Sequence, residues 1–144
     1  MAGATDYFES AVLGALLQNA NIANLGDATG VRGSTAAGNV FVSLWTVTPT
    51  DVAASGTEAA YTGYARVAVA RSSGGWTISG TTQIANAAAV TFGACTAGGS
   101  TVVAFALHDA VTAGNTLAYG PCSLAVSTGI TPAFAIGALV ITLD

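Results

Sequence analysis

The chain has 144 residues, of which 7% are charged; it contains no lysine and carries a formal net charge of −4. This length suits a single domain over residues 1–144 with a real hydrophobic core, and the charged fraction lies far below the average of about 25%. Three arginines cannot form the basic surface that binds nucleic acid, and no apolar run is long enough to span a membrane. Neither nucleic acid nor a membrane is therefore an expected partner.

Residues 6–19 form the one convincing helix. Asp6 can cap the first backbone amides, and Glu9 follows three residues later, an arrangement similar to a capping box. A helix this short is marginal alone and must pack on another element.

Apolar side chains recur along this helix at every fourth position and form one stripe, with Leu13 and Leu17 beside it. The stripe consists of Phe8, Val12 and Leu16. It fits packing on the protein's own sheet or on a partner subunit, and the sequence leaves both open.

Residues 20–39 form a long irregular segment rich in Gly, Asn and Ala, with Arg32 as its one basic residue. Loops of this length inside a compact domain are usually functional or become ordered on assembly. Its glycines do not follow the strand–GxGxxG–helix pattern of a phosphate-binding loop. We interpret the segment as an arm or an interface loop.

Residues 40–144 are expected to form a β core of short strands separated by Gly, Asn and Ser. Their spacing of roughly 8–12 residues is typical of a β-sandwich or a jelly-roll-like barrel. The fold class is therefore mainly β with one short N-terminal helix. The expected strands are 40–47, 63–71, 76–79, 83–85, 88–92, 101–108, 116–119, 123–126, 131–136 and 139–143, with a loop at 52–62.

Alternation of side chains predicts which faces of two strands are buried. In the first strand, Val40, Val42 and Leu44 share one face, opposite Phe41, Ser43 and Trp45. In strand 101–108, the inward-facing residues are expected to be Val103, Phe105 and Leu107.

No cluster of residues indicates catalysis. His108 and Asp109 are the only His–carboxylate neighbours, and no serine or cysteine stands in a nucleophile-elbow context. The carboxylates are scattered and match neither a glycosidase pair nor a metal site. We expect no catalytic residue, metal or cofactor.

Cys95 and Cys122 fit either buried thiols or a disulfide formed after release from the cell.

Glu58 and Arg66 are the expected ion pair, since in a chain with so few charges each should have a specific partner. The alternative is two solvated charges beside a hairpin. Tyr64 and Trp76 fit either exposed interface aromatics or core packing. A glycan-binding protein would use these two or Tyr61 as exposed platforms.

The low charge has two explanations. Uncharged polar residues can solvate a surface, or much of the surface can be buried against other copies or other proteins. We favour burial, given the high apolar fraction of 52% and the size of obligate interfaces.

Short motifs follow the helix in a fixed order. They are NVFVSLWT at 39–46, PTD at 49–51, GTE at 56–58, GYAR at 63–66, Trp76, NAAAVTF at 86–92, HDA at 108–110, GNTL at 114–117, YG at 119–120 and ALVITLD at 138–144. In this order the chain resembles, over residues 5–19 and 39–144, a family of small structural proteins of tailed bacteriophages. Members are described as tail-fibre-like or as head decoration (cement) proteins. Residues 20–38 and the two cysteines depart from the family pattern.

The resemblance implies a non-enzymatic, β-rich virion protein, made in the bacterial host cytoplasm and assembled as a homotrimer. Our first expectation is a capsid cement protein on the capsid surface, which binds the lattice of the major capsid protein and stabilises the mature head. The alternative is a tail fibre or tail adaptor module involved in host attachment. The candidate interface residues are Phe8, Val12, Leu16, Arg32, Glu58, Tyr64, Arg66 and Trp76.

Overall fold

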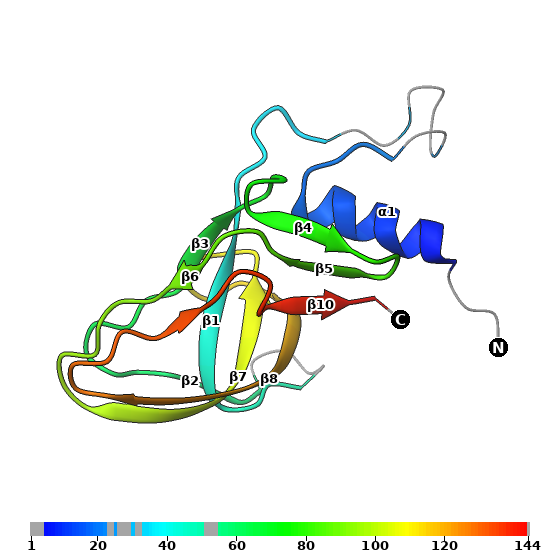
Figure 1. Ribbon diagram of the computed structural model, residues 1–144. Coiled ribbons are helices and arrows are strands. Elements are labelled where there is room, and N and C mark those ends of the chain that lie inside the picture. Colours follow the sequence, from blue (N-terminus) through cyan, green and yellow to red (C-terminus); the bar gives the residue numbers. More distant parts are fainter. Residues whose placement is uncertain (1–4, 23–24, 26–29, 31–32, 51–54, 144) are drawn as a thin grey trace. The chain divides into compact units, whose positions relative to one another are not determined.

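The computed structural model describes residues 5–22, 25, 30, 33–50 and 55–143, so the interface candidate Arg32 lies outside the described residues. The described chain forms one helix and antiparallel sheets that do not close into a barrel, which confirms the mainly β, sandwich-like prediction (Figure 1). The elements are α1 (Asp6–Leu17), β1 (Asn39–Val47), β2 (Thr57–Glu58), β3 (Val67–Ala70), β4 (Trp76–Ser79), β5 (Gln83–Asn86), β6 (Val90–Thr91), β7 (Gly99–His108), β8 (Thr116–Ser127), β9 (Ala133–Phe134) and β10 (Val140–Thr142).

The chain divides into two compact units that are interleaved in sequence. The first unit contains residues 1–39, 70–89 and 135–144, and the second contains residues 40–69 and 90–134. The N-terminal helix therefore belongs to the first unit together with β4, β5 and β10. The longest strands, β7 and β8, belong to the second.

In the first unit, α1 packs on a three-stranded antiparallel sheet with the order β10-β5-β4 (Figure 1). The helix contributes Leu13 and Leu17 to the core of this unit, and Trp76 of β4 and Ile84 of β5 are completely buried. Of the two interpretations of Trp76, core packing is the one confirmed.

The helix begins with a different cap from the one predicted. Thr5 is extended (φ −94°, ψ 153°), and its hydroxyl accepts a hydrogen bond from the backbone N–H three residues later at 3.4 Å. The prediction that Asp6 is the cap is wrong, because Asp6 is already the first helical residue. Glu9 then stands four positions after the cap instead of three, and it is buried. The helix ends two residues earlier than predicted, and Asn19 follows it in the left-handed region at φ 58°.

In the second unit, the strands follow the order β2-β1-β7-β8, with β3 also paired to β1. The antiparallel register of β1 and β7 places Leu44 opposite Phe105 and Trp45 opposite Ala104. Neighbouring β1 residues thus face opposite sides of the sheet, as predicted, and Leu44, Trp45, Phe105 and Ala104 are all buried.

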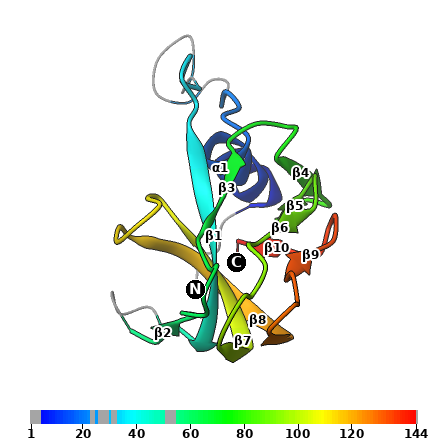
Figure 2. The ribbon, with the colours of Figure 1, turned by 90° about the vertical axis from the view of Figure 1, so that its left-hand side faces the viewer.

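A two-stranded sheet of β6 and β9 forms a second layer in this unit (Figure 2). Phe134 of β9 meets Phe105 of β7 edge to face, with ring centroids 5.8 Å apart. Phe134 also contacts Phe92, whose ring stacks on Tyr64. These aromatic contacts join the two layers of the unit.

Several strands differ from the predicted bounds; β6 and β9, for example, are shorter than the predicted strands 88–92 and 131–136. For two strands the backbone geometry gives the reason. β3 begins at Val67 instead of residue 63, since Gly63 has φ 101° and turns the chain away from an extended path. The two strands expected at 116–119 and 123–126 are one strand, β8. A bulge after Pro121 lets β8 continue, with Ala104 opposite Pro121 and Val102 opposite Leu124.

Two further expectations were wrong. β2 lies inside the segment predicted as a loop at 52–62. Val103, expected to face the core, is 37% exposed, whereas Phe105 and Leu107 are buried as predicted. Val103 lies beside the bulge and just beyond Ala104, the last residue of β7 that is paired with β1.

Candidate functional site

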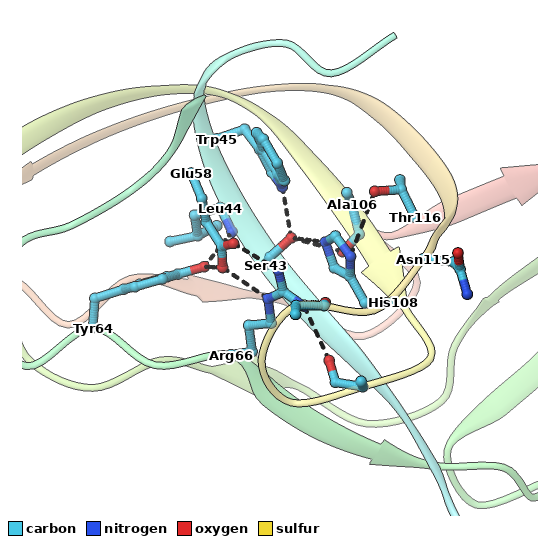
Figure 3. A network of polar contacts seen from close by, with 12 residues as sticks. Ser43, Leu44, Trp45, Glu58, Tyr64, Arg66, Ala106, His108, Asn115 and Thr116 are labelled. Atoms are coloured by element: carbon cyan, nitrogen blue, oxygen red, sulfur yellow. Dashed lines mark hydrogen bonds and ion pairs between the residues drawn. The ribbon is translucent and has the colours of Figure 1, made fainter. Parts of the chain in front are cut away.

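A polar network in the second unit joins charged, aromatic and hydroxyl side chains around β1, β2 and the end of β7 (Figure 3). At its centre, the Glu58 carboxylate accepts hydrogen bonds from Arg66, with Nε 2.9 Å from Oε1 and Nη2 2.7 Å from Oε2. The predicted Glu58–Arg66 ion pair is therefore confirmed and has the two-pronged geometry that makes such pairs strong.

The turn that precedes β3 brings Tyr64 and Arg66 back to β2. The backbone N–H of Tyr64 donates to the carbonyl of Tyr61 at 3.0 Å, and Gly63 between them has a positive φ. A Cβ atom at Gly63 would lie 2.2 Å from the carbonyl oxygen of Ala94, so only glycine fits there. The Tyr64 hydroxyl then donates to Glu58 Oε1 at 2.6 Å.

Arg66 also holds the turn between β7 and β8. Its Nη1 donates to the carbonyl oxygens of Ala110 at 3.0 Å and Ala113 at 2.8 Å. Within the same turn, the carboxylate of Asp109 accepts hydrogen bonds from the backbone and side-chain nitrogens of Asn115, each at 2.7 Å. The Arg66 side chain is only 9% exposed. It therefore connects β2 with a turn that lies more than forty residues further along the chain.

A second group of polar contacts lies on the buried face of β1 and β7. Trp45 Nε1 donates to Ser43 Oγ at 2.7 Å, and the same oxygen lies 2.8 Å from Nε2 of His108. The rings of Trp45 and His108 stack with centroids 6.0 Å apart. Ser43 is completely buried and His108 is 2% exposed.

The surroundings shift the ionisation of three of these groups. Burial alone would raise the pKa of the Glu58 carboxyl, but hydrogen bonds from Arg66 and Tyr64 outweigh burial and hold its pKa below the ordinary 4.5. Burial, strengthened by the hydrogen bond to Glu58, raises the pKa of Tyr64 far above its usual range. Burial and the charge of Arg66 lower the pKa of His108 below 6.5, so its imidazole is neutral at pH 7.

Ser43 and His108 have the spacing of a nucleophile and its base, yet their environment differs from an active site. A nucleophilic serine must be reached by substrate, and Ser43 has no exposed surface. Its oxygen already accepts the indole N–H of Trp45. The geometry therefore suits a neutral, buried cluster that fixes the packing of β1 on β7.

The described residues contain no group of three or more His, Cys, Asp or Glu side chains that could hold a metal ion. None of the described helical segments is long and apolar enough to cross a membrane. Cys95 and Cys122 are both free thiols, and burial raises the pKa of Cys122 to about 11.

The structure brings together three of the predicted interface residues. Glu58, Tyr64 and Arg66 meet in the network, whereas Trp76 lies in the core of the first unit. Tyr61 is also buried, at 5% exposure, so neither it nor Trp76 forms an exposed platform for a glycan. The helix stripe, in contrast, is accessible.

Sequence reasoning missed Arg71 as an organising residue. Its guanidinium donates to the carbonyls of Ala15 and Leu16 at the end of α1, and to Ala37 in the segment before β1, at 2.6–3.1 Å. Asn19 adds a paired contact, because its side-chain amide exchanges two 2.6 Å hydrogen bonds with the backbone of Ser34. The described part of the predicted arm is therefore fastened to the end of the helix. The scarcity of basic residues was the one signal that Arg71 has a specific partner.

The family profile described as Podophage GP4 fiber I protein gp80 matches residues 3–142. The chain belongs to this family. The gp80 match confirms the resemblance to structural proteins of tailed phages, and it covers both compact units. No curated protein matches the sequence. Membership of the gp80 family makes the chain a bacteriophage structural protein and a component of the virion.

Proposed function

We propose that this protein is a non-enzymatic subunit of the tail fibre or of the adaptor that joins a fibre to the phage tail. The observation that carries this proposal is the gp80 family match, whose description names a fibre protein and which spans residues 3–142. This places the tail alternative ahead of our first expectation, a capsid cement protein.

The surface of the second unit supports a role in assembly. β8 lies at the end of the sheet order and is twelve residues long, and no charged residue occurs in it. Most of its residues are exposed or half-buried, among them Leu117 at 42%. Long uncharged edge strands are usually protected or paired with another chain. We propose that the protein acts as a homotrimer in which part of this surface becomes buried.

Capsid decoration remains the second candidate function. These 144 residues contain no repetitive segment of the kind that forms long fibre shafts. In that case the partner is the major capsid protein, and the homotrimer covers sites on the capsid surface.

The copy number per virion separates the two candidates. We would measure the ratio of this protein to the major capsid protein in purified particles by quantitative mass spectrometry, and locate the protein with gold-labelled antibodies. A few copies per hundred capsid subunits, with label at the tail, is the expected result. A ratio near one to one, with label over the head, would establish decoration instead. Absence from the particle would refute both.

A further inference from the structure

The hydroxyl proton of Ser43 has two acceptors within reach. Ser43 Oγ lies 2.8 Å from Nε2 of His108 and 3.3 Å from the carbonyl oxygen of Ala106, the residue opposite Ser43 in the β1–β7 pair (Figure 3). The same oxygen accepts the indole N–H of Trp45 at 2.7 Å. A hydroxyl group donates one hydrogen bond and accepts up to two. The Ser43 proton can therefore point to His108 or to Ala106, but not to both.

The surroundings of Nδ1 decide between these arrangements while His108 is neutral. Nδ1 lies 3.5 Å from the hydroxyl oxygen of Thr116, and the ring also makes a hydrogen bond with the main chain of Asn115 that favours its protonated form. The carbonyl of Asn115 is bonded directly to Thr116 and can only accept, so the proton of the neutral ring belongs on Nδ1. Nε2 is then an acceptor, and Ser43 donates its proton to it.

Uptake of a proton by His108 reverses this hydrogen bond. The imidazolium carries a proton on both nitrogens, so Nε2 becomes a donor. Ser43 Oγ can accept this N–H beside that of Trp45. To do so, it turns its own proton to the carbonyl of Ala106. The new proton comes from water, and no other covalent bond changes. The cluster therefore has two hydrogen-bonded states that differ by one proton.

Three charged groups act on His108 from three parts of the second unit. Burial is the largest cause that lowers the pKa of His108, and the positive charge of Arg66, in the turn before β3, is the next. The carboxylates of Glu58 in β2 and of Asp109 after β7 oppose both by raising this pKa. Among the described residues, Arg66 is thus the positive group that a charged His108 would repel.

Arg66 connects this charge with the turn at 109–115. Its Nη1 donates to the carbonyls of Ala110 at 3.0 Å and Ala113 at 2.8 Å. Ala113 has φ 52°, a left-handed conformation that strains a residue with a side chain. Repulsion between the imidazolium and the guanidinium opposes these two hydrogen bonds, and relief of the strain at Ala113 favours release of the turn.

We propose that His108 is a proton-operated switch, in which uptake of one proton reverses its hydrogen bond with Ser43 and loosens the hold of Arg66 on the turn at 109–115. The turn carries Val111, whose side chain is 53% exposed, so the switch controls the order of an exposed apolar tip. The switch is a property of the second unit and does not depend on where the protein lies in the virion. It can therefore fail or hold independently of the proposed function.

The tautomer of the ring is the first test. His108 is the single histidine of the chain, so the imidazole nitrogen signals of the full-length, nitrogen-15-labelled protein need no assignment. At pH 7 we expect a proton on Nδ1 and none on Nε2, and Nε2 should gain its proton with a midpoint below 6.5. A proton on Nε2 at pH 7 would overturn the proposal. A midpoint below pH 4.5 would overturn it too, because the Glu58 carboxyl titrates there.

Amide hydrogen exchange tests whether the turn responds. The amide of Asn115 donates to Asp109 Oδ1 at 2.7 Å, and the amide of Asp109 donates to the Asn115 carbonyl at 3.3 Å, so both report on the turn. Exchange is compared at pH 7 and at one pH unit below the midpoint of His108, after correction for the intrinsic rate. We expect protection to fall about three- to tenfold, since an interaction worth up to one pKa unit changes an equilibrium by up to tenfold. Unchanged protection would overturn the proposal.

Two amides elsewhere in the same unit are the control. Phe92 donates to the carbonyl of Pro132, and Cys95 donates to that of Ile130. Both amides should keep their protection between the two pH values. An equal loss at these positions and in the turn would mean that acid lowers the stability of the whole unit, and this would overturn a local switch.

Two variants separate the sensor from the group that transmits its charge. In His108→Asn the protection of the turn should be the same at both pH values, and a persistent dependence would overturn His108 as the sensor. In Arg66→Met the midpoint of His108 should rise, since Arg66 lowers it, and the turn should be poorly protected at both pH values. A loss on acidification as large as in the wild type would overturn the route through Arg66. Thermal unfolding verifies that both variants fold, and the wild-type measurements require neither.

Discussion

Replacement of Arg66 by methionine tests whether the polar network holds the second unit together. Arg66→Met keeps most of the apolar stem and removes four hydrogen bonds, two to the Glu58 carboxylate and two to the carbonyls of Ala110 and Ala113. The Arg66 side chain is 9% exposed and that of Glu58 is 26% exposed. The substitution therefore leaves a largely desolvated carboxylate without its cation.

The expected loss in the free energy of unfolding follows from the partial burial of this ion pair. Exposed ion pairs contribute about 0–1 kcal/mol, whereas removal of one partner from a buried pair costs about 3–5 kcal/mol. The exposures of Arg66 and Glu58 lie between these limits, so we expect the free energy of unfolding to fall by about 2–3 kcal/mol. For a chain of this length the midpoint of thermal unfolding should fall by about 4–12 °C.

The assay is chemical denaturation of the wild type, Arg66→Met, Glu58→Gln and the double variant. Coupled partners should give an interaction free energy of about 1.5 kcal/mol or more. Hydrogen exchange in the turn at 109–115 should also increase in Arg66→Met, because Arg66 holds two carbonyls of that turn. A coupling below about 0.5 kcal/mol together with unchanged exchange would refute the reasoning.

The pH dependence of stability tests the Glu58–Arg66 pair independently. The pKa of Glu58 is lowered in the folded protein, so its contribution to stability is fully present above the ordinary value of 4.5 and is lost as the pH falls through the folded value. The wild type should therefore lose stability below pH 4.5, and Arg66→Met should show a shallower loss. Equal slopes for the two proteins would show that Arg66 does not set this pKa.

Three further substitutions test the buried cluster and the tight turn. Ser43→Ala removes the acceptor of the Trp45 indole N–H and should cost about 1–3 kcal/mol in guanidinium unfolding; a neutral effect would contradict the network. Since the pKa of His108 is lowered on folding, the wild type should lose stability as the pH falls from about 6.5, and His108→Asn should remove this dependence. Gly63→Ala places a methyl group 2.2 Å from a backbone oxygen and should cost at least about 2 kcal/mol more than Gly80→Ala, where φ is also positive (73° against 101°) but no atom lies within 4 Å of the new methyl group. Equal losses in the two glycine variants would exclude the clash as the cause.

Local sequence pattern was sufficient to predict much of the fold. The alternation from Val40 to Trp45 correctly predicts β1 and its two faces, because the side-chain period of a strand does not depend on its partners. The fourfold spacing of Phe8, Val12 and Leu16 correctly predicts a helix. This spacing does not tell which side of the helix is buried. The structure buries Leu13 and Leu17, whereas Phe8 and Leu16 are exposed.

Features that depend on pairing between segments far apart in the chain could not be predicted from the sequence. β2 has only two residues, so its pairing with β1 leaves no periodic signal. The bulge that carries β8 past Pro121 likewise depends on the opposite strand. The Glu58–Arg66 pair could be predicted from the scarcity of charge, but its extension to the turn at 109–115 required the register of β7 with β8. Arg71 and the Ser43–His108 contact connect segments more than fifty residues apart and escaped detection for the same reason.

The positions and partners of the described charged residues connect the fold with the proposed function. Arg66 and Arg71 both bind main-chain carbonyls of their own chain, and the Glu58 carboxylate is paired with Arg66. Glu9 is buried, and Asp109 is bound to the turn that contains it. These five charges are thus bound or buried within their own chain, while large exposed surfaces such as β8 consist of uncharged residues. A protein that worked as an isolated monomer would gain solubility by the opposite arrangement, with charge spread over its surface. The observed distribution is the one expected of a subunit whose exposed strands become covered in the virion.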